Sequence, residues 1–535
     1  MQVSSNAATQ SGEKASSQKL VVLASSLGTV FEWYDFYIYG SLAVFFGALF
    51  FPAANPAAGF LASLATFGAG FAVRPFGALV FGRLGDLVGR KYTFLVTITV
   101  MGLSTALVAF LPTYESIGIW APIILVTLRL LQGLALGGEY GGAATYVAEH
   151  SPDNKRGFFT SWIQTTATLG LFLSLFVILI CRASMDADSF KEWGWRIPFG
   201  ISIILLAISV YIRLKLEESP VFRQMKKEGR GSKSPLRDSF GNWRNAKLVL
   251  LALLGATAGQ GVVWYTGQFY ALFFLNTTLG VDYQTTYILI GASLLIGTPF
   301  FIFFGALSDR IGRKKIMMAG CFLAALTYFP IFHALTQAAN PALKQASTNA
   351  PVTVMADANT CHFSVFITSL ETDCDKMRAY LTRRGISYTF AEGAPGQALT
   401  ANIGAAQMTG FDEMAVKAGL AEAGYPEKAD PTQINKPLVV LLLSILVIYV
   451  TMVYGPIAAF LVELFPARIR YTSMSFPYHI GNGWFGGFLP FLTAAIAIHT
   501  GNIYAGLWYP IIIAIMSLII GGLFIKETKD HKIYT

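Results

Sequence analysis

Five stretches of the 535-residue sequence contain no Asp, Glu, Lys or Arg, and each is long enough to cross a lipid bilayer. A bilayer core of about 30 Å requires roughly 20 consecutive apolar residues of helix. Hydrophobic residues make up 54% of the chain and charged residues 13%, so much of its surface is expected to face lipid. The sequence therefore predicts an all-α membrane protein. The five runs are Tyr92–Tyr114, Leu248–Val281, Ile316–Leu343, Pro437–Val462 and Tyr471–Ile525.

The hydrophobic pattern predicts twelve transmembrane helices in two sets of six, separated by a polar, basic linker. The first set is expected near residues 20–46, 60–82, 92–112, 119–145, 158–181 and 197–212. The second set is expected near 248–275, 284–307, 316–336, 437–461, 472–495 and 504–525.

Lysine and arginine are unevenly distributed between the two sides of these helices. The short loops of one side contain only Arg182, Lys191 and Arg196, whereas the other side is strongly basic. Because positive residues accumulate on the cytoplasmic side, we expect both termini in the cytoplasm and the protein in a bacterial inner (plasma) membrane. The net charge of +9 is accordingly interpreted as a topology signal and not as a nucleic-acid-binding surface. The predicted segments are a cytoplasmic tail (1–19), an N-terminal six-helix bundle (20–214), a cytoplasmic linker (215–247), a C-terminal six-helix bundle (248–336 and 437–525), a periplasmic insertion (337–436) and a cytoplasmic tail (526–535).

Two motifs occur once in each set of helices. Gly82–Lys91 (GRLGDLVGRK) recurs as Gly305–Lys314 (GALSDRIGRK), and the pattern E-x-x-P-x-x-x-R of Glu149–Arg156 recurs in Glu463–Arg470. The offsets of the two pairs, 223 (309 − 86) and 314 (463 − 149), differ by 91 residues. The halves are therefore predicted to be repeats, and the second is predicted to carry an insertion of about that size in Gln337–Lys436.

The repeated G-x-L-x-D-x-x-G-R-K segment resembles the signature of the major facilitator superfamily, although Leu87 replaces its usual basic residue. Within that superfamily, the chain resembles the metabolite:proton symporter family. The resemblance implies the major facilitator fold and alternating access. It further implies proton-coupled symport of a small organic acid or zwitterion, as in permeases for 2-oxoglutarate, citrate, shikimate, proline or betaine. The segments that carry it are Gly28–Phe36, Arg74–Gly77, Arg129–Gly133 with Gly137–Glu139, Trp195–Phe199 and Glu217–Pro220.

The repeated charged residues are candidates for a gate on the cytoplasmic face. Glycines permit a tight turn there, and the carboxylates can cap helix starts or pair with arginines of the other half. The alternative is a turn anchored by positive charge, which does not explain the repeated Asp. The gate candidates are Asp86, Arg90, Glu149 and Arg156 in the first half, and Asp309, Arg313, Glu463 and Arg470 in the second.

Charged residues within the predicted spans are few, and all lie in the first half: Glu32, Asp35, Arg74, Arg129 and Glu139. A central charge costs roughly 2.5–3.5 kcal/mol on insertion scales, so these groups should pair or line a cavity. Glu32 and Asp35 share a helix face, where two carboxylates raise each other's proton affinity, and they are our proton-coupling candidates. The alternative is a fixed ion pair with Arg74 or Arg129.

Arginine and amide side chains supply candidates for substrate binding. Arg129 can hold a carboxylate with two hydrogen bonds, and Arg74 precedes a proline that distorts its helix. On the seventh helix, the spacing of Gln260, Trp264 and Gln268 places a polar and aromatic stripe on one face. Helix packing is the alternative role for each. The full candidate set is Arg129, Arg74, Gln164, Gln260, Trp264 and Gln268, with Tyr454, His479 and Asn482 weaker.

The insertion is predicted to form a small external α+β unit. Phe363–Thr368 and Ile386–Phe390 are expected to be strands, and Lys376–Arg384 a helix between them. Cys361 and Cys374 are predicted to form a disulfide, with two free thiols in a flexible loop as the alternative.

Sequence motifs for catalysis are absent. The chain has no Walker-type phosphate loop, no Gly-x-Ser-x-Gly elbow and no metal-ligand spacing of His and Cys, so we expect neither an enzyme nor a bound metal or cofactor. The expected partners are a small-molecule metabolite, protons and the lipid bilayer, with the protein a monomer. The alternatives are an uncoupled facilitator or exporter, and a membrane receptor with an external sensing domain; the repeated motif and buried charges disfavour the receptor.

Overall fold

The computed structural model describes residues 22, 25–26, 29–31, 33–35, 37–42, 45–51, 66, 68–215, 217–361 and 372–533. Within these residues, ten helical spans are long and apolar enough to cross a membrane. The first two predicted spans fall partly outside these ranges, so the count of twelve stays a prediction. Ten spans suffice to establish a multi-pass membrane protein. They are Arg90–Val108, Trp120–Glu149, Asp153–Ala183, Arg196–Leu214, Trp243–Thr278, Tyr283–Ile311, Arg313–Ala339, Lys436–Leu464, Arg470–Thr500 and Ala505–Phe524.

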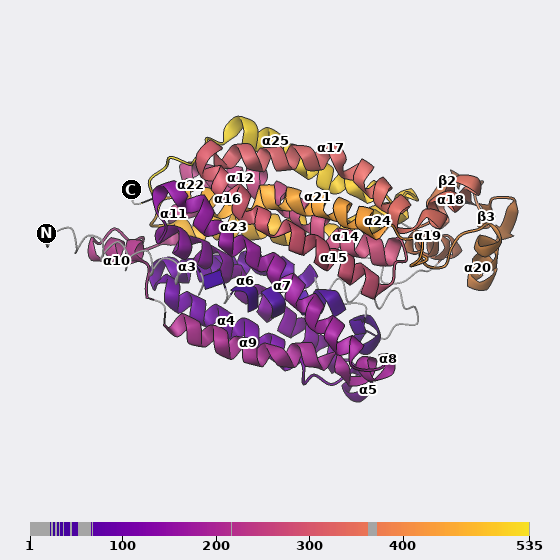
Figure 1. Ribbon diagram of the computed structural model, residues 1–535, viewed down its shortest axis with the longest axis horizontal. Coiled ribbons are helices and arrows are strands. Elements are labelled where there is room, and N and C mark those ends of the chain that lie inside the picture. The colour runs from indigo at the N-terminus through magenta and orange to yellow at the C-terminus, as the bar shows by residue number, and fades with distance from the viewer. Residues whose placement is uncertain are drawn as a thin grey trace.

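The helices form two bundles that lie side by side, the first drawn in indigo to magenta and the second in rose to yellow (Figure 1). The first bundle contains α3 (Arg74–Leu87), α4 (Arg90–Val108), α5 (Tyr114–Ile117), α6 (Trp120–Glu149), α7 (Arg156–Ala183), α8 (Ala187–Ser189) and α9 (Arg196–Leu214). The linker contains α10 (Pro220–Lys227) and α11 (Pro235–Phe240). The second bundle contains α12 (Trp243–Ala252), α13 (Ala258–Tyr265), α14 (Ala271–Phe273), α15 (Tyr283–Gly297), α16 (Pro299–Ile311), α17 (Arg313–Ala339), α21 (Lys436–Tyr454), α22 (Ile457–Leu464), α23 (Arg470–Ile480), α24 (Leu489–Thr500) and α25 (Trp508–Phe524).

Spans of the second bundle are interrupted where the sequence predicted continuous helices, and two of these interruptions lie at Pro299 and Pro456. Pro299 begins α16 immediately after α15, and Pro456 separates α21 from α22. Proline has no N–H to donate and its ring clashes with the preceding turn, so each helix restarts there.

Close helix packing in the first bundle depends on glycine. A Cβ on Gly133 of α6 would lie 1.9 Å from the carbonyl oxygen of Gly70, and one on Gly77 of α3 would lie 2.0 Å from that of Leu134. Only glycine permits backbones to approach this closely. The contact brings Gly70, before α3, against the α6 turn that carries Arg129, and the backbone of Arg74 against Gly137 further along α6.

The insertion is an α+β unit with a four-stranded sheet in the order β2-β1-β3-β4. β1 pairs with β2 in parallel (Val352 opposite Tyr388) and with β3 antiparallel (Val352 opposite Ile403), and β3 and β4 form a hairpin. Helix α19 makes the crossover from β1 to β2. The elements are α18 (Pro341–Asn349), β1 (Val352–Ala356), α19 (Asp373–Arg383), β2 (Tyr388–Glu392), β3 (Thr400–Ile403), β4 (Ala406–Thr409) and α20 (Glu413–Glu422).

The helix and the second strand of the insertion begin and end at other residues than the sequence predicted. Helix α19 begins at Asp373 because the hydroxyl of Thr372 accepts a hydrogen bond from the N–H of Asp375, at 3.1 Å. The second predicted strand is β2, shifted to Tyr388–Glu392, and the predicted strand Phe363–Thr368 lies outside the described residues. The structure joins Cys361 to Cys374 in a disulfide, with the two Cα atoms 5.3 Å apart.

The insertion lies at the end of the molecule opposite α10, α11 and the C-terminal segment (Figure 1). Its two ends are adjacent, since the N–H of Asn435 donates to the carbonyl of Ala338 at 2.9 Å. Two further backbone hydrogen bonds fix it to the second bundle: Tyr388 N–H to Gly501 O at 2.7 Å, and Ala429 N–H to Gly280 O at 3.1 Å.

Candidate functional site

The carboxylate of Asp86, at the end of α3 in the first half, caps a helix of the second half. It accepts hydrogen bonds from the N–H of Thr472 at 3.0 Å, from the hydroxyl of Thr472 at 2.8 Å and from the N–H of Tyr471 at 3.4 Å. These are first-turn groups of α23, whose N–H groups have no partners within the helix. The contact joins the halves at the end of the molecule that carries the linker.

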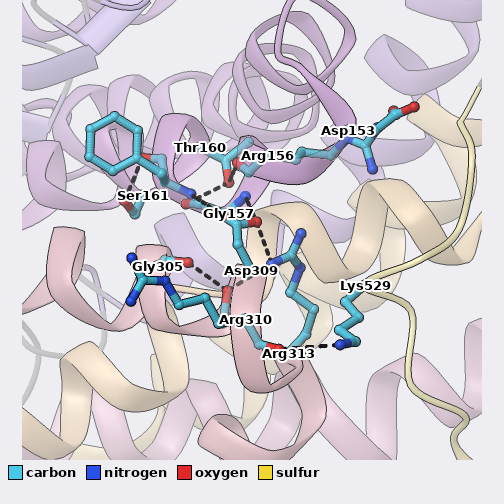
Figure 2. Close-up of polar contacts among 12 residues, drawn as sticks. Asp153, Arg156, Gly157, Thr160, Ser161, Gly305, Asp309, Arg310, Arg313 and Lys529 are labelled. Carbon is cyan, nitrogen blue, oxygen red and sulfur yellow. Dashed lines mark hydrogen bonds and ion pairs between the residues drawn. The ribbon is translucent and has the colours of Figure 1, made fainter.

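Asp309, the repeat equivalent of Asp86, makes the reciprocal contact. Its carboxylate accepts hydrogen bonds from the N–H groups of Gly157 and Phe158, each at 2.8 Å, and so caps α7 of the first half (Figure 2). Arg313 holds the Asp309 carboxylate from its own half, with Nη1 2.6 Å from Oδ1. Each half therefore caps one helix of the other.

Two buried glutamates complete the same interface. Arg470 donates to Glu149 at 2.9 Å, and Arg156 donates to Glu463 at 2.9 Å, both across the halves. Arg313 also lies 2.9 Å from Glu463 within the second half. All these side chains are almost fully buried, so removing one partner would cost about 3–5 kcal/mol.

Arg90 completes the first cluster, 3.3 Å from Asp86 and 4.0 Å from Glu149. The structure thus brings the eight predicted gate residues together in two symmetric clusters, where the two halves are in contact. We refer to them as the gate clusters.

Four further residues belong to the gate clusters and were not predicted. Glu218 accepts hydrogen bonds from the N–H groups of Arg90 and Lys91 at the start of α4, and Glu527 accepts from those of Arg313 and Lys314 at the start of α17. The next residue in each case, Ser219 or Thr528, donates its hydroxyl to Glu149 or Glu463. Glu218-Ser219 and Glu527-Thr528 are a third repeat, each closely following the last helix of its half.

The segment after Thr528 reaches arginines that belong to both halves. Arg156 donates to the carbonyl of His531 at 3.4 Å, and Arg470 donates to that of Ile533 at 2.8 Å. The His531 ring also contacts the carbonyl of Glu463, and Ile533 is buried. This segment, Thr528–Ile533, therefore contacts both gate clusters.

Between the bundles, a cluster of aromatic rings surrounds Trp264. Its ring centroid lies 6.2 Å from Trp33 and 6.0 Å from Tyr37 of the first half, and 6.3 Å from Tyr454 of the second. The guanidinium carbon of Arg74 lies 5.9 Å from the Trp33 ring centroid. The cluster therefore combines one buried cation with several electron-rich ring faces.

The other predicted binding residues are distributed around this aromatic cluster. Gln260 pairs with Asn482 within the second half, amide to amide, at 2.9 and 3.0 Å. Gln268 donates to the hydroxyl of Thr168 in the first half at 3.2 Å, and Gln164 donates to Tyr140 at 2.9 Å. Of the two glutamines in the predicted stripe, Gln260 therefore bonds within its own half and Gln268 bonds to the other half.

Tyr140 connects the halves through its ring. It stacks on Tyr478 with ring centroids 3.6 Å apart, and the hydroxyls of Tyr478 and Tyr454 are 2.7 Å apart. The neighbouring His479 is buried, and neither of its ring nitrogens has a hydrogen-bond partner within the described part of the chain. Within that part, His479 thus lacks the hydrogen-bond partner that a histidine in a membrane helix usually has.

Arg129 is buried on α6. It donates to Gln132 Oε1, and Gln132 in turn donates to Thr105 at 2.8 Å. Its guanidinium carbon lies 4.0 Å from the Tyr39 ring centroid, a cation–π contact. Glu139, further along α6, pairs with Arg213 at 2.6 Å, a partner that the sequence did not suggest.

Asp35 is 3% exposed, and its Oδ1 has no hydrogen-bond partner among the residues that the structure describes. None of the ion pairs found among those residues involves it. Its proposed neighbour in proton coupling, Glu32, lies outside the described residues.

Sequence and structure comparisons identify related proteins. The sugar (and other) transporter family profile matches residues 20–249, and the MFS/sugar transport protein profile matches residues 141–468. The shikimate transporter of Escherichia coli is 37% identical over 58% of this chain and 72% of its own length, and the alpha-ketoglutarate permease of E. coli is 35% identical over 60% and 72%. The proline/betaine transporter of Salmonella typhimurium is 38% identical over 58% of this chain, and the match spans 63% of its length.

The fold is shared with a solved transporter structure, that of the proton:xylose symporter XylE. The two are 15% identical, with a TM-score of 0.67 over 97% of this chain and 98% of the other. Together with the paired gate motifs, these matches show that the chain belongs to the major facilitator superfamily of transporters.

Proposed function

We propose that this protein is a secondary active transporter that moves a small organic acid or zwitterionic metabolite together with protons. The symmetric gate clusters are the observation that carries the proposal. Because each half caps a helix of the other through one aspartate, separating the halves at this end exposes both helix starts to water. Alternating access requires such an interface, which closes one end while the other opens.

The aromatic cluster supports a substrate that carries a carboxylate. Arg74 offers a buried guanidinium, which matches a carboxylate in charge and geometry. The ring faces of Trp33, Trp264 and Tyr37 beside it suit a substituted ammonium group. The related transporters are named for proline and betaine, shikimate and alpha-ketoglutarate, all of which carry a carboxylate.

Proton coupling is assigned to the first half. Asp35 is a buried acid without an ion-pair partner among the described residues, and such acids mark proton paths in membranes. We place the protein in a bacterial inner membrane as a monomer, with the gate clusters, linker and termini in the cytoplasm and the insertion in the periplasm. The excess of Lys and Arg on the gate side supports this orientation.

Uptake into proteoliposomes tests the proposal. Purified protein is assayed with labelled proline, glycine betaine, shikimate and 2-oxoglutarate, with an inward proton gradient and with that gradient collapsed by a protonophore. Accumulation of at least one substrate above equilibrium, lost with the protonophore, is the expected result. Equal counterflow with and without the gradient, and no accumulation, would show an uncoupled facilitator.

A further inference from the structure

The Cys361–Cys374 disulfide of the insertion lies at a position that suits thiol–disulfide exchange. Cys361 follows β1 after the short turn Ala358–Thr360, and Cys374 is the second residue of the crossover helix α19. Both therefore lie at the carboxyl end of β1, where a parallel strand passes into its helix. Open sheets place their reactive groups at this edge, and redox dithiols of the thioredoxin type also lie beside the start of a helix, although their C-x-x-C spacing differs from the separation of 13 residues here.

The two sulfurs differ in accessibility. Cys361 is half-buried, whereas Cys374 is 1% exposed. A thiolate must approach one sulfur of a disulfide directly to attack it, so Cys361 is the accessible target and Cys374 the leaving group. Cys374 lies in the first turn of an 11-residue helix, whose N–H groups and dipole stabilise a thiolate.

Acidic residues beside Cys374 oppose this stabilisation, and their charge is partly compensated. The Asp373 carboxylate accepts a hydrogen bond from the N–H of Phe411 at 3.2 Å and lies 3.8 Å from the Lys376 ammonium. Asp375 is buried. Arg378, one turn further along α19, adds a buried positive charge on the same helix.

The junction is held together by more than the disulfide. The hydroxyl of Thr372 donates to the carbonyl of Thr360 at 2.6 Å, which ties the residue before α19 to the residue before Cys361. The Asp357 carboxylate accepts hydrogen bonds from the N–H groups of Asn359 and Gly396, at 2.9 and 2.8 Å. The two cysteines are therefore expected to stay close after reduction, as a centre that re-forms its disulfide requires.

We propose that the insertion is a thiol–disulfide exchange domain, in which the Cys361–Cys374 pair accepts two electrons from a soluble dithiol on the face opposite the gate. A thiolate of the dithiol attacks Sγ of Cys361, and the bond to Cys374 breaks with its electron pair on Sγ of Cys374. The second thiolate of the dithiol then attacks the dithiol sulfur that is bonded to Cys361. Cys361 is released with the electron pair of that bond. The dithiol becomes a disulfide, and its two electrons and two protons end on the two cysteines. The reverse reaction with a disulfide restores the pair, and neither direction depends on what the bundles transport.

Redox titration of the full chain tests the proposal. The protein in nanodiscs is equilibrated with defined ratios of reduced to oxidised glutathione, and free thiols are alkylated and located by peptide mass spectrometry. The native pair is expected to become reversibly reduced within the range of these buffers. Structural disulfides resist the glutathione pool, so a pair that stays oxidised until the chain is unfolded would overturn the proposal. Cys181 and Cys321, both buried in helices, serve as internal controls for folding.

Matched variants identify the attacked sulfur. Cys374→Ser leaves Cys361 without its partner and is expected to retain glutathione as a mixed disulfide. Cys361→Ser leaves the buried Cys374, where we expect at least about tenfold less adduct under the same conditions. Equal adduct on the two variants would contradict the assigned roles. The titration of the native pair stands even where a variant folds poorly.

Discussion

The Asp86 carboxylate and the Thr472 hydroxyl, 2.8 Å apart, join the two halves of the molecule at the start of α23. Asp309 repeats the arrangement at the start of α7, where it accepts from Gly157 and Phe158. Each cap is therefore a contact between the halves, and under the proposed mechanism it is lost when the halves separate.

Replacing Asp86 with alanine should favour the open gate. Loss of a helix cap costs about 0.5–2 kcal/mol, so the ratio of open to closed protein should rise roughly 2- to 30-fold. Ser475, buried on α23, reports the change when it is replaced by cysteine. The measurement is its rate of maleimide labelling from the gate side, which should rise in Asp86→Ala.

A matched control exists in Asp282, which caps α15 by accepting from the N–H of Thr285 at 2.9 Å. Asp282→Ala removes a cap of the same type within one half, so labelling at position 475 should not change. Similar labelling in the two variants would mean that the caps stabilise helices and do not hold the gate.

Removing the residues after Glu527 should also favour the open gate. The truncation retains the cap at α17 but removes the contacts of Thr528, His531 and Ile533 with Glu463, Arg156 and Arg470. The same assay should show faster labelling of the cysteine at position 475. The free-energy effects of the truncation and of Asp86→Ala should add only if the segment and the cap act independently. Asp530→Ala, which alters an exposed residue of the segment, should have no effect.

Asp35→Asn should abolish accumulation driven by a proton gradient. The amide is similar in size to the carboxyl group but does not load and release a proton. Exchange of internal for external substrate, which needs no net proton movement, should be partly retained. Uptake and counterflow in the same liposomes measure both, and undiminished accumulation by Asp35→Asn and by Glu32→Gln would refute the assignment.

Arg129→Lys should weaken substrate binding if the arginine contacts the anionic group. Lysine keeps the charge but loses the planar pair of donors, and a hydrogen bond to a charged group contributes about 1.5–3 kcal/mol. We therefore expect the apparent affinity to fall about ten- to hundredfold, measured by concentration-dependent uptake. Unchanged affinity with a lower melting temperature would instead show that Arg129 stabilises α6 through its contacts with Gln132 and Tyr39.

The repeats allowed the contacts between the halves to be predicted, because a second copy of Asp86 as Asp309 singled out the residue type and its position. Glu218 and Glu527 were not predicted, because the pattern that they share, a glutamate followed by a hydroxyl residue, is only two residues long. A comparison of the residues just after the last helix of each half would have found them, since Glu218 follows the end of α9 and Glu527 the end of α25. The partners of buried charges depended on helix packing: Arg213 pairs with Glu139 from the end of another helix.

The fold was predicted well where the chain meets lipid and less completely in the insertion, where α19, β2 and the disulfide were predicted but β1, β3 and β4 were not. Long charge-free runs leave few alternatives to membrane helices. In the insertion, strands of four or five residues, such as β3 and β4, consist largely of small and polar residues that also suit turns. Pairing of β3 with β1 over a long sequence separation stabilises this hairpin, and that pairing is not visible locally.

The hydrogen bond between Asn435 and Ala338 has a practical consequence for the architecture of this transporter. Because the insertion leaves the second bundle almost where it entered, a single genetic event can add or remove it without changing the register of α17 or α21. The same site should accept another compact protein whose ends lie close together. A fluorescent protein or antibody-binding module grafted there would mark one half of the molecule, giving a pseudo-symmetric particle the asymmetric feature that electron microscopy needs for alignment.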